Sequence, residues 1–172
     1  KKEKVLEKIS KDVWNGIELI RRMRELEIFV TSHKDLEIYS VLEVLLNVKN
    51  NYSATKFNIT GDCHILADKA LNSVFDNIIR NAIMHGKADI INIDIVGKGK
   101  ICEVRIADTG NGIPDEIKEK LFEEGVKYGK TGHTGLGLYI VKKAMENYGG
   151  NVYIENNKPT GTIFVLVFKR IT

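Results

Sequence analysis

The chain has 172 residues, of which 43% are hydrophobic, and its formal net charge is +3. This length and composition fit one domain with a real core and room for an additional element. The charge is small and the Lys and Arg residues are scattered among acidic ones, which argues against nucleic acid as a partner. No apolar run reaches the roughly 18 residues of a membrane-spanning helix, and no secretory signal is visible.

Residues 1 to about 30 predict one long amphipathic helix. A stripe of this length favours a bundle or coiled-coil seam over a helix lying flat on the domain. The chain opens on Lys1-Lys2 rather than Met, so we expect a fragment of a longer protein. The apolar positions recur at steps of three and four residues: Leu6, Ile9, Val13, Ile17, Ile20 and Met23.

Helices and short strands are predicted in the next part of the chain. A helix over Leu36 to Lys49 would be capped by Asp35. A strand at Lys56 to Ile59 runs into a turn at Thr60 to Asp62. A longer helix is expected from about Asp68 to His85, with its apolar positions on a buried side.

Alternating apolar residues predict an antiparallel hairpin between Ile91 and Ala107. Helices follow at about Pro114 to Phe122 and Gly137 to Tyr148, and strands at Val152 to Ile154 and Thr162 to Phe168. This mixed order indicates an α+β fold, a two-layer α/β sandwich with helices on one face of a mixed sheet.

The cysteines give no sign of pairing. Cys63 and Cys102 are far apart and form no CxxC pattern, so we predict free thiols in a reducing compartment. A metal half-site at Cys63-His64 is disfavoured, because no second Cys/His pair supports it.

Two asparagines lie within the long predicted helix near its end. Asn77 and Asn81 are four residues apart and therefore share a helix face. An Asn carbonyl oxygen is a hard neutral ligand, suited to a Mg²⁺ ion that takes its other ligands from phosphates and water. The alternative is a pair of ordinary exposed asparagines, which their place in an apolar run makes less attractive.

A carboxylate flanked by glycines ends the predicted hairpin. Asp108 precedes Gly110 and Gly112, whose flexibility lets a flat ring approach the backbone. The carboxylate can accept a hydrogen bond from an exocyclic amine, which adenine has where guanine has a carbonyl. The alternative is an ordinary turn at a strand end.

A glycine-rich turn opens the last predicted helix. The free N–H groups of a helix that begins at Gly135-Leu136-Gly137 favour a phosphate. The preceding residues 125–134 predict a mobile lid, in which Lys127 and Lys130 either contact phosphates or are merely solvated.

These motifs resemble the ATP-binding catalytic domain of sensor histidine kinases, within the wider fold that gyrase and MutL share. Asn77 to Ala82 is similar to the N box, and Asp108 to Gly112 to the G1 box. Leu121 to Glu123 is similar to the F box, and Thr134 to Leu138 to the G2 box. Gly161 to Phe164 resembles the closing strand, whose Thr helps to hold the adenine-reading Asp.

The resemblance implies ATP and Mg²⁺ as cofactors. Asn81 would ligate Mg²⁺, and both Asn77 and Asn81 would serve catalysis. Asp108 would bind the adenine amine. The other nucleotide-binding residues that it implies are His85, Gly110, Gly112, Ile113, Lys127, Lys130, Thr134, Gly135, Leu136, Gly137 and Thr162.

Two departures from the family pattern affect the expected rate. Met84 stands where the family often has Lys or Arg near the phosphates. The F box keeps Phe122 but has Gly125-Val126 in place of a second Phe.

The resemblance also implies domains and partners. Residues 1–49 would hold the end of a dimerisation helix and a connecting helix, and residues 50–172 the ATP-binding domain. His33 lacks the residues that should follow a phosphoacceptor, so we expect the accepting histidine upstream of Lys1. The expected partners are that histidine helix of the parent kinase and a response-regulator receiver domain. We expect a homodimer for the parent, a monomer for the fragment, and a cytoplasmic location, which includes the cytosolic part of a membrane-bound sensor.

Two other functions remain open at this point. An ATP-hydrolysing clamp of the same fold would usually have Glu at position 77, whereas Asn77 is no general base. A nucleotide-binding or interaction module without turnover is the second, and the missing charge at Met84 keeps it open.

Overall fold

The computed structural model describes residues 5–10, 12–13, 16–17, 19–20, 23, 27, 36–126 and 135–171. Every described residue between 5 and 27 is helical, as the apolar stripe predicts. The large apolar side chains of this segment are more than half exposed, from 51% at Ile17 to 68% at Ile20. None of the described helices combines the length and apolar character needed to cross a membrane.

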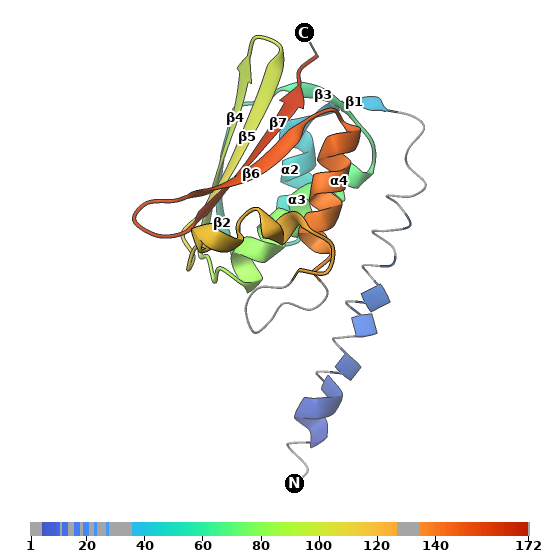
Figure 1. Ribbon diagram of the computed structural model, residues 1–172, viewed down its shortest axis with the longest axis vertical. Coiled ribbons are helices and arrows are strands. Elements are labelled where there is room, and N and C mark those ends of the chain that lie inside the picture. The colour runs from blue at the N-terminus through green and yellow to red at the C-terminus, as the bar shows by residue number, and fades with distance from the viewer. Residues whose placement is uncertain are drawn as a thin grey trace.

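A five-stranded mixed sheet forms one layer of the α/β body (Figure 1). β2 runs parallel to β4, and the remaining neighbours are antiparallel. This confirms the predicted hairpin β4–β5, and the last two predicted strands, β6 and β7, also pair with each other. In spatial order, the strands are β2 (Lys56–Thr60), β4 (Ile90–Lys98), β5 (Ile101–Asp108), β7 (Thr162–Lys169) and β6 (Asn151–Asn156).

Three helices form the second layer on one face of the sheet (Figure 1). They are α2 (Val41–Lys49), α3 (Ala70–Met84) and α4 (Gly137–Asn147). Ile91, Ile93 and Ile95 of β4 and every second residue of β5 are buried beneath them, as the predicted alternation requires. The predicted α+β two-layer fold is therefore confirmed.

The predicted helix over Leu36 to Lys49 is wrong in its first part. Residues Glu37–Ser40 form strand β1, which pairs antiparallel with β3 (His64–Ala67), and α2 begins only at Val41. Pairing with a segment that is distant in sequence overrides the local helical pattern. Ser40 caps α2 by accepting a hydrogen bond from the Glu43 N–H at 3.1 Å, and this Ser-x-x-Glu spacing was the available signal. The predicted cap Asp35 lies outside the described residues.

The side chains of α2 belong to the same core as the sheet. Val41, Val44, Leu45 and Val48 are buried and pack within one hydrophobic cluster with α3 and α4. The folded body thus begins before residue 50, where we predicted the domain boundary. The assignment of residues 1–49 to a dimerisation and connecting region stays a prediction.

The helix predicted from Pro114 to Phe122 is replaced by two single 3₁₀ turns, η1 (Asp115–Ile117) and η2 (Lys120–Phe122). The neighbouring side chains of Leu121 and Phe122 are both buried, each 6% exposed. Ile113 and Ile117 also pack against the core, so the apolar spacing favoured an α-helix, but each observed turn is only three residues long, as is usual for 3₁₀ segments.

The prediction of free thiols is also wrong. Cys63 and Cys102 form a disulfide, and their Cα atoms are 6.2 Å apart. Both side chains are buried, one before β3 and the other on β5. The tertiary fold brings these segments together, and nothing in the cysteine spacing indicates it.

Candidate functional site

The site forms where the loop after β5 meets the end of α3. Asn111 donates its backbone N–H to the Gly86 carbonyl at 2.9 Å. A methyl group at Gly110 would overlap the same carbonyl, so only glycine permits this close approach. Gly86 in turn donates its N–H to the Asn81 carbonyl, so this residue links two of the predicted motifs.

Asp108 is the buried carboxylate of the site, only 3% exposed. Its Oδ1 accepts hydrogen bonds from the N–H groups of Gly110 at 2.8 Å and Thr162 at 3.2 Å. Within the described part of the chain, no residue donates to its other oxygen, Oδ2. One oxygen is thus fixed by the protein, and the other remains for a donor on a ligand.

Burial raises the pKa of the Asp108 carboxyl above its usual range. The hydrogen bonds from Gly110 and Thr162 act in the opposite direction, because they stabilise the carboxylate. A donor on a bound ligand would further favour the charged form.

Two loops close around Asp108. Gly112 and Gly161 have φ values of +76° and +117°, which L-residues rarely adopt. A methyl group at Gly161 would overlap the Asp108 carbonyl oxygen, and one at Gly112 would lie 3.3 Å from the Gly161 oxygen. Ile113 is half-buried and packs against the core beside these loops. The predicted base-pocket residues are therefore neighbours in the fold.

Asn81 lies near the end of α3 and is half-buried. Its backbone carbonyl accepts hydrogen bonds from the N–H groups of His85 at 3.0 Å and Gly86 at 3.1 Å. Its side-chain amide makes no hydrogen bond with any residue that the structure describes. A half-buried carbonyl oxygen with no partner among the described residues fits a ligand of a hard cation.

Asn77, in contrast, is fully buried between α3 and α4. Its Nδ2 donates to the Ser73 carbonyl at 2.8 Å, and its Oδ1 accepts from Arg80. A methyl group at Gly137 would lie 2.6 Å from that Oδ1, so Asn77 sets how closely α4 approaches α3. The predicted catalytic role of Asn77 stays a prediction.

The start of α4 lies beside Gly125 and Val126. A methyl group at Gly135 would come within 2.5 Å of the Gly125 and Val126 backbone, and Leu136 precedes the helix as its N-cap. The predicted contacts Lys127, Lys130 and Thr134 lie outside the described residues.

The far ends of α3 and α4 are joined by a second buried contact. The Tyr148 hydroxyl donates to Asp68 Oδ1 at 2.6 Å, and the Ala70 N–H donates to the same oxygen at 2.8 Å. Burial and the neighbouring Asp68 raise the pKa of Tyr148 well above its usual range. The two helices that carry Asn81 and Gly137 are therefore tied by a buried hydrogen bond at one end and packed closely against Asn77 at the other.

Sequence reasoning passed over two residues of the site. Arg80 bonds Asn77 and lies 3.7 Å from the Asp76 carboxylate, where it is largely buried. Asn157 donates from its side chain to the Asp108 carbonyl at 2.7 Å. No local signal in the sequence around Asn157 indicates this contact.

Known proteins resemble the chain in sequence. Residues 67–171 match the family described as histidine kinase-, DNA gyrase B- and HSP90-like ATPase. The sensor histidine kinase CitA of Klebsiella pneumoniae is 39% identical over 77 residues, which are 45% of this chain and 13% of CitA. The sensor histidine kinase AruS of Pseudomonas aeruginosa is 29% identical over 149 residues, 76% of this chain and 15% of AruS. The chain thus spans a small part of these relatives.

Solved structures resemble it in fold. The ATP-binding domain of PrrB from Mycobacterium tuberculosis is 24% identical with a TM-score of 0.67, over 81% of this chain and 100% of that one. Full-length ShkA, solved with AMPPNP, is 20% identical with a TM-score of 0.75, over 94% of this chain and 37% of that one. With the family match over residues 67–171, the chain belongs to the histidine kinase-, DNA gyrase B- and HSP90-like ATPase family, with the ATP-binding fold of sensor histidine kinase catalytic domains.

Proposed function

We propose that this chain is the catalytic ATP-binding part of a sensor histidine kinase, and that it directs the γ-phosphate of ATP to a histidine on another domain. The observation that supports this most is the arrangement of Asp108 and Asn81. Each presents one oxygen without a described protein partner, on two motifs that touch through Gly86.

Asp108 would read the base. Its Oδ2 would accept a hydrogen bond from the exocyclic amine of adenine, while the N–H groups of Gly110 and Thr162 donate to Oδ1. A buried acceptor that meets no donor is costly, so a base with a carbonyl at this position would bind poorly. The pocket therefore favours adenine over guanine.

Asn81 would hold Mg²⁺ through its amide oxygen, and the phosphates would supply further ligands. When bound, the ion supplies neutralisation of the charge on the phosphate oxygens. The N–H groups at the start of α4 would bind a phosphate, because a helix N-terminus carries partial positive charge.

Phosphoryl transfer would then rest on positioning. A histidine nitrogen attacks the γ-phosphorus in line, the phosphorus–nitrogen bond forms as the bond to the bridging oxygen breaks, and ADP leaves. Asn77 argues for transfer rather than hydrolysis, because its buried amide cannot activate water as a general base.

The partners and location are part of the proposal. The phosphoacceptor helix of the parent kinase and a receiver domain would be the successive phosphate acceptors, in a homodimeric parent with this part in the cytoplasm. Relatives named sensor histidine kinases support this assignment. The exposed apolar stripe before residue 28 supports helix pairing in the parent.

The decisive experiment compares this chain with its longer parent. We expect the chain to bind a fluorescent ATP analogue, more tightly with Mg²⁺, yet to incorporate no label from γ-labelled ATP. The parent should form an acid-labile phosphohistidine. Stoichiometric label on His33 would contradict an acceptor outside this chain. Binding without any transfer by the parent would support the module without turnover.

A further inference from the structure

The β6–β7 turn reaches back to the residue that we assign to the adenine amine. We infer that Asn157, in this turn, is a positioning residue that sets adenine selectivity by holding the backbone of Asp108. This inference rests on the proposed function, because it assumes that Asp108 accepts the amine.

Asn157 uses each of its polar side-chain atoms in a different direction. Its Nδ2 donates to the Asp108 carbonyl at 2.7 Å, and its Oδ1 accepts the Lys158 N–H at 2.9 Å. Its backbone N–H donates to the Gly161 carbonyl at 3.1 Å, which closes the turn. The amide is therefore held in one orientation, with its donor directed at Asp108.

The contact continues the support of Asp108 beyond the sheet. The β5–β7 ladder ends at Ala107 and Ile163, one residue before Asp108. From there, Asn157 holds the carbonyl of Asp108 while the Thr162 N–H holds its Oδ1. The turn therefore fixes the backbone of Asp108 while the first residue of β7 fixes its side chain, and together they set the direction of the open Oδ2.

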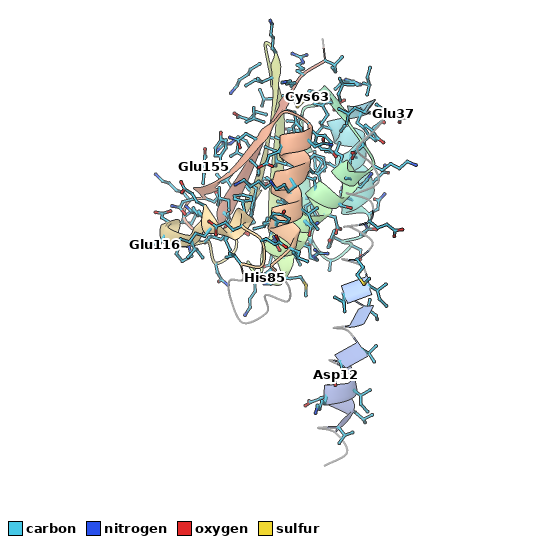
Figure 2. The ribbon with its side chains drawn as sticks, turned by 45° about the vertical axis from the view of Figure 1, so that its right-hand side comes forward. Asp12, Glu37, Cys63, His85, Glu116 and Glu155 are labelled. Atoms are coloured by element: carbon cyan, nitrogen blue, oxygen red, sulfur yellow. A yellow bond between two sulfur atoms is a disulfide. The ribbon has the colours of Figure 1, made fainter. Side chains whose placement is uncertain are left out.

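A second set of contacts joins the β6–β7 turn to the segment around η1, which follows the Asp108 loop. Lys118, which follows η1, donates to Asn156 Oδ1 at 2.7 Å, and Asn156 donates to Asp115 at 3.0 Å. Figure 2 shows Glu116 of η1 and Glu155 of β6 on the same side of the molecule. The turn is therefore anchored where it can act on Asp108.

A turn that merely stabilises the domain would also contain such bonds. The two roles differ in their dependence on the ligand. If Asn157 directs Oδ2, its loss should lower the affinity for a ligand with an amine more than the affinity for a ligand without one. If its loss only loosens the pocket, both affinities should fall equally. ATP and purine riboside triphosphate, which lacks the exocyclic amine, form the required pair.

The test measures both affinities by calorimetry for the wild-type chain and Asn157→Ala. We expect ATP to bind about fivefold to tenfold more weakly to the variant, the scale of one lost hydrogen bond, and the amine-free analogue to change less than about twofold. Asn157→Asp should lose more ATP affinity, because a carboxylate would face the Asp108 carbonyl.

Asn151→Ala is the matched control. Asn151 is exposed at the other end of β6, and its Oδ1 accepts the next residue's N–H at 2.9 Å, as in Asn157, but it does not contact Asp108. It should leave both affinities unchanged. Thermal unfolding of each variant checks that the domain remains folded.

Equal losses for the two ligands, or none for either, would overturn the inference. Asp108→Asn distinguishes this from failure of the proposed function. If Asp108→Asn loses ATP selectively while Asn157→Ala does not, only the role of Asn157 is wrong. If Asp108→Asn also leaves the ATP affinity unchanged, adenine does not bind at Asp108. The assignments of both Asp108 and Asn157 are then wrong.

Discussion

The two sides of the nucleotide site are built differently. On the base side, Asp108 receives hydrogen bonds from Gly110, Thr162 and Asn157. On the phosphate side, the Asn81 amide has no partner in the described part of the chain, and α4 begins without a side-chain cap.

The difference follows from what each side recognises. A base is neutral and flat, and a single hydrogen bond distinguishes adenine, so the acceptor must be held in place before the base arrives. Phosphates and a metal ion bring their own charge and ligands, and they satisfy protein groups that are open beforehand. Substitutions on the two sides should therefore fail in different ways.

The largest effect is expected for Asn81→Ala. It removes the proposed Mg²⁺ ligand, and phosphoryl transfer in the parent should fall by roughly 100-fold or more, the scale of a lost charge-stabilising contact. Nucleotide affinity without metal should barely change. The exposed Asn72 of the same helix supplies the control, Asn72→Ala. If Mg²⁺ enhances binding equally in Asn81→Ala and wild type, the metal assignment is wrong.

Gly110→Ala tests the junction between the two sides. Because the added methyl group overlaps the Gly86 carbonyl, we expect the free energy of unfolding to fall by about 1–3 kcal/mol, with weaker ATP binding. Gly16→Ala is the control, because no atom lies within 4 Å of a methyl group added there, and it should not lose stability. Denaturant titration measures the free energy of unfolding of both variants. A Gly110→Ala variant as stable as wild type would contradict the close packing of Gly110 on Gly86.

Asp108→Asn should weaken ATP binding about tenfold or more, or about 1.4 kcal/mol, because its amide donor would face the adenine amine. The asparagine oxygen can still accept from Gly110 and Thr162, so the loss should be in affinity rather than in folding. The exposed Asp89 provides the matched change Asp89→Asn. If the two variants bind ATP with equal affinity, Asp108 is not part of the base site.

The smallest effect concerns pH. Since the pKa of Asp108 is raised in the folded protein, ionising this group costs native stability, and its favourable contribution disappears as pH rises through the raised pKa. The stability of Asp108→Asn relative to wild type should therefore increase as the pH rises above about 4 without nucleotide. Unfolding curves at several pH values measure this. A difference that is constant with pH would contradict the buried, unpaired oxygen.

Local patterns in the sequence determined much of the fold. The buried face of α3, the alternation of β4 and β5, and the start of α4 at Gly137 all follow from periodicity and glycine placement within short windows. The same windows contain the Asn, Asp and Gly motifs, so the family and its candidate site were predictable from them.

The tertiary structure alone decided the contacts between distant segments. Strand β1 forms because β3 offers it a partner, and Cys63 meets Cys102 across a separation of 39 residues. Asn157 reaches Asp108 from 49 residues away, and neither neighbourhood indicates the contact. Periodicity reports which face of an element is buried, but not which element covers it, because that depends on the free energy of the whole packed arrangement.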